Sequence, residues 1–215
     1  MFRLVIFDLD GTLLNTIGDL AAAGNHTLAE MGFPQHEEDK YRHFVGNGIP
    51  KLIERMLPAG HDKATEERAF AMFNEYYSRH KCDHTKPYPG MPELIRDIKA
   101  QGVVCGANSN KADEFSQVIV AHYFPGIFEV IRGNLPGTPV KPDPGVARGI
   151  LEKLNARPEE TLMVGDSDVD IRTGHNAGLK ACGVTWGFRS RENLVNAGAD
   201  FLADTPAELE KLLMN

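Results

Sequence analysis

The chain has 215 residues, of which 42% are hydrophobic and 25% charged, and its formal net charge at pH 7 is −7. This composition predicts a globular protein of one large or two small domains, and the acidic balance, without any run of Lys and Arg, argues against a nucleic-acid partner. No apolar segment approaches the ~18 residues needed to cross a bilayer, and the first strand-like run begins almost at Met1, which leaves no room for a signal peptide. We therefore expect a cytoplasmic protein, a monomer or homodimer, with no membrane partner.

Short apolar runs that are typical of buried strands recur along the chain, at residues 4–7, 103–107, 128–131, 161–164 and 181–184. Helix-patterned segments lie between most of them, and three have readable ends, at residues 92–100, 144–154 and 168–177. This alternation predicts an α/β fold, a doubly wound parallel sheet of Rossmann-like type with helices on both faces.

The segment between the first two strands is much longer than a simple crossover needs, and it contains about seventy residues that are nearly all helix-patterned. We interpret it as a small inserted helical domain. A capping pair, Asn15-Thr16, marks its start, and the stiff linker Lys86-Pro87-Tyr88-Pro89-Gly90 marks its end. The predicted domains are an α/β core of residues 1–14 and 86–215 and an inserted helical domain of residues 15–85.

The first strand runs directly into two carboxylates, Asp8 and Asp10, followed by Gly11 and Thr12. Both aspartates should emerge at the carboxyl end of the strand, where open α/β sheets hold their ligands. Carboxylates crowded in one place repel one another unless a positive charge lies among them. Oxygen ligands favour a hard divalent cation, so this motif predicts a Mg²⁺ site.

Three further motifs fall at or beyond the ends of later strands. In the first, Ser109 and Asn110 follow residues 103–107, which predicts a hydroxyl and a run of backbone N–H groups at the start of the next helix, a natural phosphate site. In the second, Lys141 lies between two prolines that restrict its backbone, so that its ammonium can be aimed inward. In the third, Asp166 ends a strand and Asp170 follows one helical turn later, so that the two carboxylates can face one point.

Two aspartates for nucleophilic and proton-transfer chemistry, a hydroxyl and a lysine for phosphate oxygens, and further aspartates for a metal together favour phosphoryl transfer. Here the chain resembles the haloacid dehalogenase superfamily of Mg²⁺-dependent aspartyl phosphatases, because all four of its motifs occur in order from Asp8 to Asp170. The helical insertion resembles the cap of the phosphoglycolate phosphatase branch. So do Val45-Gly46-Asn47-Gly48 and the segment from Tyr76-Tyr77 to Gly90.

This resemblance implies a role for each motif residue. Asp8 would attack phosphorus and become an aspartyl-phosphate, while Asp10 would protonate the leaving oxygen and then activate water. Mg²⁺ would be held by Asp8, Asp166 and the backbone carbonyl of Asp10, with Asp170 supporting the site directly or through water. Ser109 and Lys141 would bind the transferring phosphoryl oxygens, helped by the N–H groups near Asn110. Asn15 and Ser109 depart from the family's commoner aspartate and threonine, and neither change removes a catalytic group.

The substrate must be selected by what the cap places over the core. Pro50 suits the first turn of a helix that runs through Leu52, Ile53 and Met56, so the preceding Gly46–Gly48 loop offers a helix N-terminus to an anion. Our hypothesis is that Gly46 and Asn47 face Asp8 and meet the far end of a small phosphorylated metabolite that is itself an acid, such as phosphoglycolate.

Other functions share parts of this pattern. A phosphomutase of the same superfamily, similar to beta-phosphoglucomutase, carries the same four motifs and stays open as an alternative. A non-enzymatic phospho-accepting signalling module also combines acids, a hydroxyl and a lysine, although such a module is about half this length and has no inserted cap. A dehalogenase would leave Asp10 and the metal ligands without a role. An inactive regulatory protein is disfavoured because no motif residue is missing.

Some residues have simpler interpretations. His80 and His84, with Cys82 and Asp83 between them, could imitate a zinc site, but we interpret them as side chains near the connection between the domains. Asp143 is interpreted as a cap for the helix that follows it. Three cysteines are too few and too scattered for a disulfide framework, and they are predicted to be buried thiols.

Overall fold

The computed structural model describes residues 2–214 and separates into two compact units. The first unit combines residues 1–15 with residues 87–215, and the second consists of residues 16–86. The strands β2 (Leu14–Asn15) and β3 (Lys86–Pro87) form a small separate sheet at the residues where the chain leaves and re-enters the first unit.

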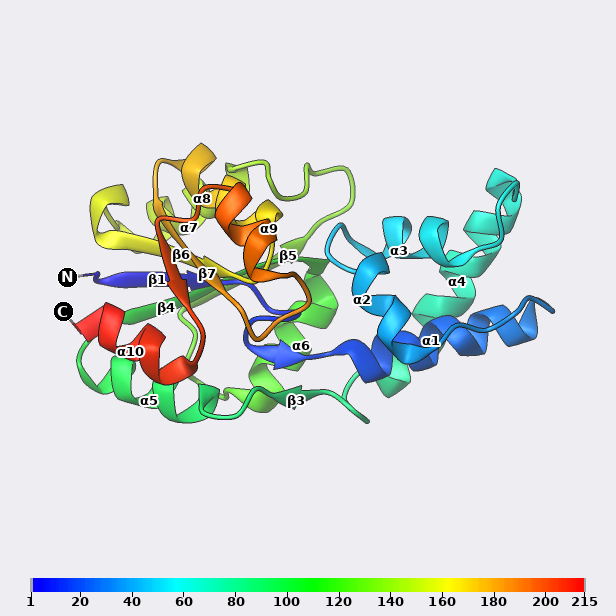
Figure 1. The fold of residues 1–215 in the computed structure, drawn as a ribbon, viewed down its shortest axis with the longest axis horizontal. Coiled ribbons are helices and arrows are strands. Elements are labelled where there is room, and N and C mark those ends of the chain that lie inside the picture. Colours follow the sequence, from blue (N-terminus) through cyan, green and yellow to red (C-terminus); the bar gives the residue numbers. More distant parts are fainter. Residues whose placement is uncertain (1, 215) are drawn as a thin grey trace. The chain divides into compact units, whose positions relative to one another are not determined.

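A six-stranded sheet forms the centre of the first unit (Figure 1). Its order is β5-β4-β1-β6-β7-β8, and every neighbouring pair is parallel. The α/β fold with a parallel sheet is therefore confirmed. The strands are β1 (Leu4–Phe7), β4 (Val104–Ala112), β5 (Val130–Asn134), β6 (Thr161–Gly165), β7 (Lys180–Val184) and β8 (Phe201–Ala203).

Helices cover both faces of this sheet, as a doubly wound fold requires. One face carries α5 (Met91–Ala100), α6 (Asp113–Tyr123) and α10 (Pro206–Met214), and the other carries α7 (Gly145–Leu154), α8 (Asp168–Ala177) and α9 (Arg191–Asn196) (Figure 1). A short 3-10 helix, η2 (Pro158–Glu160), leads into β6. Strand β1 is buried along its whole length, because its two faces are both packed against helices. Leu4 and Ile6 pack in one cluster with Ile150 of α7 and Met163 of β6.

The strand order fixes where a ligand can bind. The chain first builds the sheet outward from β1 to β4 and β5, and then returns to the other side of β1 to add β6, β7 and β8. In such a sheet the crevice lies beyond the carboxyl ends of the two strands where the order reverses, which here are β1 and β6. Residues that follow these two strands are therefore neighbours, and the Asp8 N–H donates to the Val164 carbonyl oxygen at 2.8 Å.

The second unit is helical. It contains α1 (Ile17–Glu30), the short helices η1 (Glu38–Lys40) and α2 (Tyr41–Phe44), α3 (Ile49–Met56) and α4 (Lys63–His80). Its fully buried aromatic side chains are Tyr41, Phe73 and Tyr77. Asp19 of α1 is also fully buried, and it accepts hydrogen bonds from the His84 N–H and from the Thr85 N–H and hydroxyl at 2.6–2.9 Å. These bonds tie the first turn of α1 to the segment that returns toward β3.

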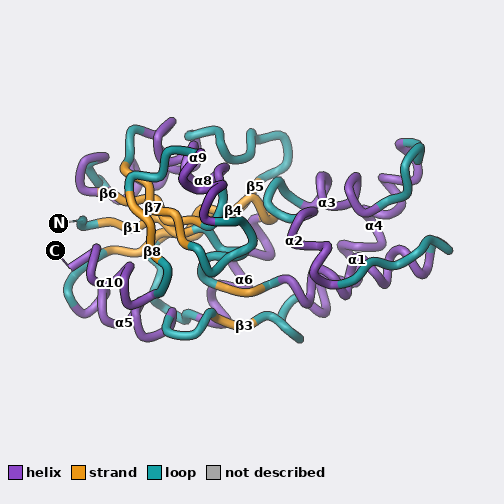
Figure 2. Tube along the Cα trace, in the orientation of Figure 1, coloured by secondary structure: helices purple, strands orange, loops and turns teal. Residues whose placement is uncertain are grey.

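One local prediction was wrong. Ser109 and Asn110 do not open a helix, because β4 continues through them to Ala112 and α6 begins only at Asp113 (Figure 2). The pairing of β4 with β5 shifts register between Asn108 and Ala112. The polar end of β4 therefore stays extended, beside the carboxyl ends of β1 and β5, which the amino-acid types alone do not suggest.

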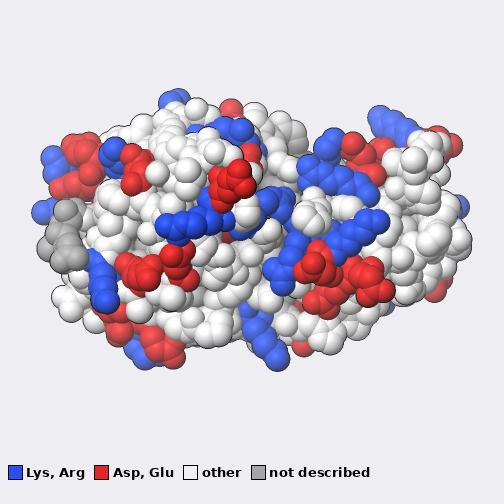
Figure 3. Space-filling model, viewed as in Figure 1, with Lys and Arg blue, Asp and Glu red and all other residues white. Residues whose placement is uncertain are grey.

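Groups of Lys and Arg lie next to groups of Asp and Glu on the face drawn in Figure 3. No helix within residues 2–214 combines the length and apolarity needed to span a membrane. Cys105 and Cys182 are buried thiols whose pKa is raised by burial to about 12, whereas Cys82 is only half-buried.

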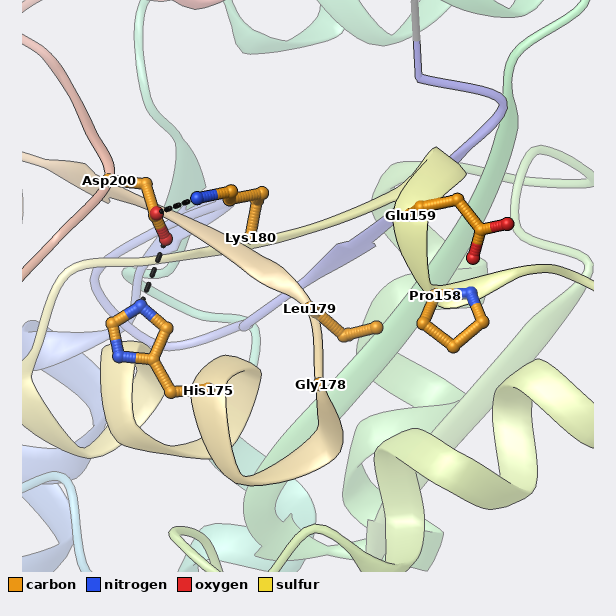
Figure 4. Close-up of a pocket in the computed structure, with 7 residues that line it drawn as sticks. All are labelled: Pro158, Glu159, His175, Gly178, Leu179, Lys180 and Asp200. Carbon is orange, nitrogen blue, oxygen red and sulfur yellow. Dashed lines mark hydrogen bonds and ion pairs between the residues drawn. The ribbon is translucent and has the colours of Figure 1, made fainter.

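A cavity of about 460 Å³ lies beside the amino end of β7, away from the carboxyl ends of the strands (Figure 4). Its charged groups bond to one another: Asp200 accepts from Lys180 Nζ at 2.6 Å, from the Ala181 N–H at 2.9 Å and pairs with His175 Nε2 at 2.9 Å. Partial burial would raise the pKa of Asp200, but the bonds from Lys180, Ala181 and His175 outweigh it and lower that pKa to about 2. We interpret this group as a structural tie between α8, β7 and the start of β8.

Candidate active site

Three buried carboxylates meet at the crevice of the first unit. Asp8 follows β1, Asp166 follows β6, and Asp170 lies in the first turn of α8. One oxygen from each lies within 4.8 Å of the others, and the three residues are 7%, 3% and 1% exposed. Carboxylates at this distance in a buried site need a compensating positive charge.

Lys141 supplies part of that charge. Its Nζ lies 2.6 Å from Asp8 Oδ1 and 2.6 Å from Asp170 Oδ1, and the residue is 5% exposed. The Asn110 side chain holds the Lys141 backbone, because Asn110 Oδ1 accepts from the Lys141 N–H at 2.8 Å and Nδ2 donates to its carbonyl at 3.4 Å. Lys141 therefore lies inside the acidic group rather than on the surface.

The remaining carboxylate oxygens are distributed unevenly. Asp170 Oδ2 accepts from the Ser167 N–H at 3.1 Å and from its hydroxyl at 2.6 Å, so both oxygens of Asp170 are engaged. Asp166 Oδ2 accepts from the Phe188 N–H at 2.6 Å. The bonds described here leave Asp8 Oδ2 and Asp166 Oδ1 unused. These two oxygens come from the ends of adjacent strands, and the third carboxylate, Asp170, lies close to both residues. Together they form a donor set that fits Mg²⁺.

The pKa shifts of the cluster also favour a bound cation. Burial raises the pKa of Asp8 well above its usual value, the charges of Asp170 and Asp166 raise it further, and Lys141 opposes them. Burial and the charge of Asp170 raise the pKa of Asp166 to about 7, against a lowering effect of the Phe188 N–H. Burial alone would lower the pKa of Lys141, but Asp170 and Asp8 outweigh it and raise that pKa. One ammonium thus leaves the cluster short of positive charge.

The other predicted core residues lie in the same part of the fold. Asp10 follows Asp8 by two residues, and its Oδ2 lies 3.2 Å from Lys111 Nζ. Ser109 is buried in β4, and its Oγ accepts from the Lys111 N–H at 3.2 Å. The side chain of Asn110 is occupied by the Lys141 backbone, so its structural contribution is to hold that lysine. The predicted role of the N–H groups near Asn110 stays a prediction.

Gly46 and Asn47 lie in the second unit, in the loop before α3, and the predicted helix with Pro50 in its first turn is present. Arg55 fixes this loop, since its Nη1 donates to the Phe44 carbonyl at 2.9 Å and its Nη2 donates to Asn47 Oδ1 at 2.8 Å. These bonds occupy the amide oxygen of Asn47. That the loop meets a substrate stays a prediction.

Sequence reasoning assigned no role to several contributors to the site. Lys111 is buried against Asp10, and the Phe188 N–H bonds to Asp166. Two glycines are also required, because a Cβ at Gly165 would collide with Asp170 and a Cβ at Gly187 would collide with Asp166. The segment of Gly187 and Phe188 follows the carboxyl end of β7. Because ligands of open α/β sheets bind beyond the carboxyl ends of the strands, this position could have indicated the segment.

The zinc alternative gains no support. Over residues 2–214, the cluster of Asp8, Asp166 and Asp170 is the one group of acidic, His or Cys side chains that brings three ligand atoms together in this way. His80 Nδ1 instead pairs with Asp83 Oδ2 at 2.7 Å, and the His84 N–H donates to Asp19. Asp143 Oδ1 accepts from the Gly145 N–H at 2.8 Å at the start of α7, in keeping with its interpretation as a cap.

Comparison with known proteins identifies the relatives of this chain. Residues 5–184 match the model of the haloacid dehalogenase-like hydrolase family. The chain is 34% identical over 214 residues to a phosphoglycolate phosphatase of Aquifex aeolicus, covering 99% of this chain and 97% of that protein. It is 32% identical over 220 residues to a phosphoglycolate phosphatase of Haemophilus influenzae, covering 99% and 98%. The crystal structure of a predicted phosphoglycolate phosphatase from Haemophilus somnus superposes with a TM-score of 0.91 at 28% identity, covering 98% and 97% of the two chains.

Proposed function

Because the chain belongs to the haloacid dehalogenase-like hydrolase family and is a phosphatase, we propose that it hydrolyses a small phosphorylated acid of the phosphoglycolate type, with Mg²⁺ and through an aspartyl-phosphate. The observation that carries this proposal is the buried cluster of Asp8, Asp166 and Asp170, in which the ammonium of Lys141 bridges Asp8 and Asp170. We further propose that residues 15–85 act as the cap of this site.

In the first proposed step, Asp8 attacks phosphorus with a carboxylate oxygen, and the bond between phosphorus and the ester oxygen breaks. Asp10 gives its proton to that oxygen, so the product leaves as an alcohol and not as an alkoxide. In the second step, Asp10 takes a proton from water while that water attacks the aspartyl-phosphate. Inorganic phosphate leaves, and Asp8 returns to its carboxylate form.

The positive groups make attack by one anion on another feasible. Lys141 already contacts Asp8, so its ammonium is placed beside the phosphoryl group that Asp8 would accept. The Ser109 hydroxyl at the end of β4 would donate to a phosphoryl oxygen. Mg²⁺, bound to Asp8 and Asp166 with Asp170 in support, would neutralise charge on the nucleophile and on the phosphoryl oxygens.

The choice of phosphoglycolate rests on the names of the relatives and on the cap. Relatives that match this chain over nearly its whole length carry the name phosphoglycolate phosphatase. In the loop before α3, Arg55 holds the amide oxygen of Asn47, which leaves the Asn47 amide N–H groups as donors suited to a carboxylate. We propose that this loop recognises the carboxylate of the substrate.

A panel of phosphomonoesters tests the proposal. Wild-type protein, Asp8→Asn and Asn47→Ala are assayed for released phosphate with Mg²⁺ and with a chelator. We expect phosphoglycolate to be preferred over neutral esters, chelation and Asp8→Asn each to abolish turnover, and Asn47→Ala to reduce the preference. Near-normal turnover by Asp8→Asn would overturn the nucleophile assignment. Transfer of phosphate to another hydroxyl without release of phosphate would identify a mutase, and a phosphoprotein that persists for minutes would identify a signalling module.

A further inference from the structure

Lys111 is a buried cation to which the proposed reaction assigns no role. It lies near the end of β4, its side chain is 1% exposed, and its Nζ lies 3.2 Å from Asp10 Oδ2. Burying an ammonium is costly unless an anion compensates for it. An ion pair at the surface contributes little free energy. The ammonium of Lys111 is buried, so it needs a compensating partner.

The two oxygens of Asp10 have different surroundings. Oδ2 pairs with Lys111, while Oδ1 is buried and has no hydrogen-bond partner among the described residues. The Asp10 side chain as a whole is 13% exposed. A carboxyl group fixed through one oxygen presents its other oxygen in a defined direction, and an unpaired buried oxygen is a group available to a reacting atom.

We infer that Lys111 is a positioning residue: its ammonium pairs with Oδ2 of Asp10, and once Asp10 carries a proton on Oδ1 the same contact aims that proton at the leaving oxygen. This inference rests on the proposed function, because it needs Asp10 to be the general acid. The two buried lysines then have separate tasks. Lys141 lies against the nucleophile Asp8, and Lys111 lies against the acid Asp10.

A positioning role predicts an effect that depends on the leaving group. The leaving group of phosphoglycolate is a strongly basic alkoxide that needs a well-placed acid, whereas the leaving groups of 4-nitrophenyl phosphate and acetyl phosphate are weakly basic and need little help. The constant kcat/KM reports steps up to the loss of the leaving group, so it isolates this difference from the later hydrolysis of the aspartyl-phosphate.

The experiment compares Lys111→Met with wild type on these three substrates at saturating Mg²⁺. We expect kcat/KM for phosphoglycolate to fall about a hundredfold, the size of effect that a displaced catalytic group produces. For the two activated substrates we expect a loss below about threefold. Lys111→Arg, which keeps a cation and its donors, should recover part of the loss. Lys99→Met is the matched control, because Lys99 bonds to Ile127 and Glu129 away from the site. This variant should leave kcat/KM unchanged for all three substrates.

A double-mutant cycle separates positioning from a structural role. If Lys111 acts through Asp10, adding Lys111→Met to Asp10→Asn should lower kcat/KM for phosphoglycolate by less than about twofold, against about a hundredfold when Asp10 is present. Equal losses on all three substrates, or additive effects in the cycle, would overturn the inference. If Lys111→Met does not fold, Lys111→Gln is measured in its place, with the same criteria. Activity of Asp8→Asn, run in parallel, shows separately whether the proposed function itself fails.

Discussion

Replacing Lys141 by methionine removes the ammonium that two buried carboxylates share, with little change in volume. Each of its contacts joins opposite charges 2.6 Å apart. At an effective dielectric constant of about 20, each contact represents a gross attraction of about 6 kcal/mol. Desolvation of the ammonium offsets several kcal/mol of this attraction, and breaking one partner of a buried pair typically costs about 3–5 kcal/mol. We therefore expect the free energy of unfolding of metal-free Lys141→Met to fall by about 3–5 kcal/mol at pH 7.

Mg²⁺ and pH should both reduce this loss. Mg²⁺ bound at the proposed site would neutralise the same carboxylates, so it should stabilise Lys141→Met more than it stabilises wild type. Burial and its acidic neighbours hold the folded-state pKa of Asp8 above its unfolded value, so ionised Asp8 costs stability above that unfolded value. Removal of Lys141 increases this cost, and the cost disappears as pH falls and the carboxyl groups protonate. The loss should therefore be smaller at pH 4 to 5 than at pH 7.

Urea denaturation followed by circular dichroism, at both pH values and with and without Mg²⁺, measures these differences. Exposed Lys153→Met in α7 is the control for loss of one positive charge, and it should change stability by less than about 0.5 kcal/mol. A loss below about 1 kcal/mol in metal-free Lys141→Met would refute the reasoning, because the ammonium would then not compensate for the buried acids. A loss of the same size at every pH and Mg²⁺ concentration would refute it as well.

Two further predictions concern the surroundings of the site and the distant ion cluster. Gly187→Ala should raise the Mg²⁺ concentration for half-maximal activity by about tenfold, because the new methyl group would collide with Asp166 and displace it, whereas Gly149→Ala, which has open space around it, should leave this value unchanged. Equal Mg²⁺ titrations for both variants would show that Asp166 does not need its present position. Asp200→Asn should cost about 1 kcal/mol at pH 7, a value discounted for solvent screening. Because the pKa of Asp200 is lowered to about 2, wild type holds this advantage above its unfolded pKa and loses it as pH falls from about 4 to 2. An advantage independent of pH in urea denaturation would show that charge is not its source.

Local sequence signals located some elements well. Helix α8 has the predicted bounds, since Ser167 and Asp170 form a capping box at its start and Gly178 adopts a left-handed conformation at its end. Strand β1 also matches its prediction, because four consecutive apolar residues end at Asp8. The short strands β2, β3 and β8 were not predicted. They have two or three residues each, too few for a recognisable pattern.

The part of the site that sequence could not reveal depends on contacts between distant segments. A lysine in a polar motif normally lies on the surface, and the pairing of Lys111 with Asp10 across two strand ends helps to make its burial favourable. The donor to Asp166 at Phe188 is a backbone N–H, which any residue type would supply. The acidic residues, in contrast, were found because the carboxyl ends of parallel strands meet at one edge of a sheet.

The central claim is that Asp8 is the nucleophile and carries the phosphoryl group during turnover. The most direct test mixes the enzyme with phosphoglycolate and Mg²⁺, quenches the reaction in acid within milliseconds, and locates bound phosphate by mass spectrometry of the peptides. The account predicts a phosphoryl group on Asp8 in wild type and none in Asp8→Asn. Phosphate bound to a different residue, or steady turnover by Asp8→Asn, would contradict it.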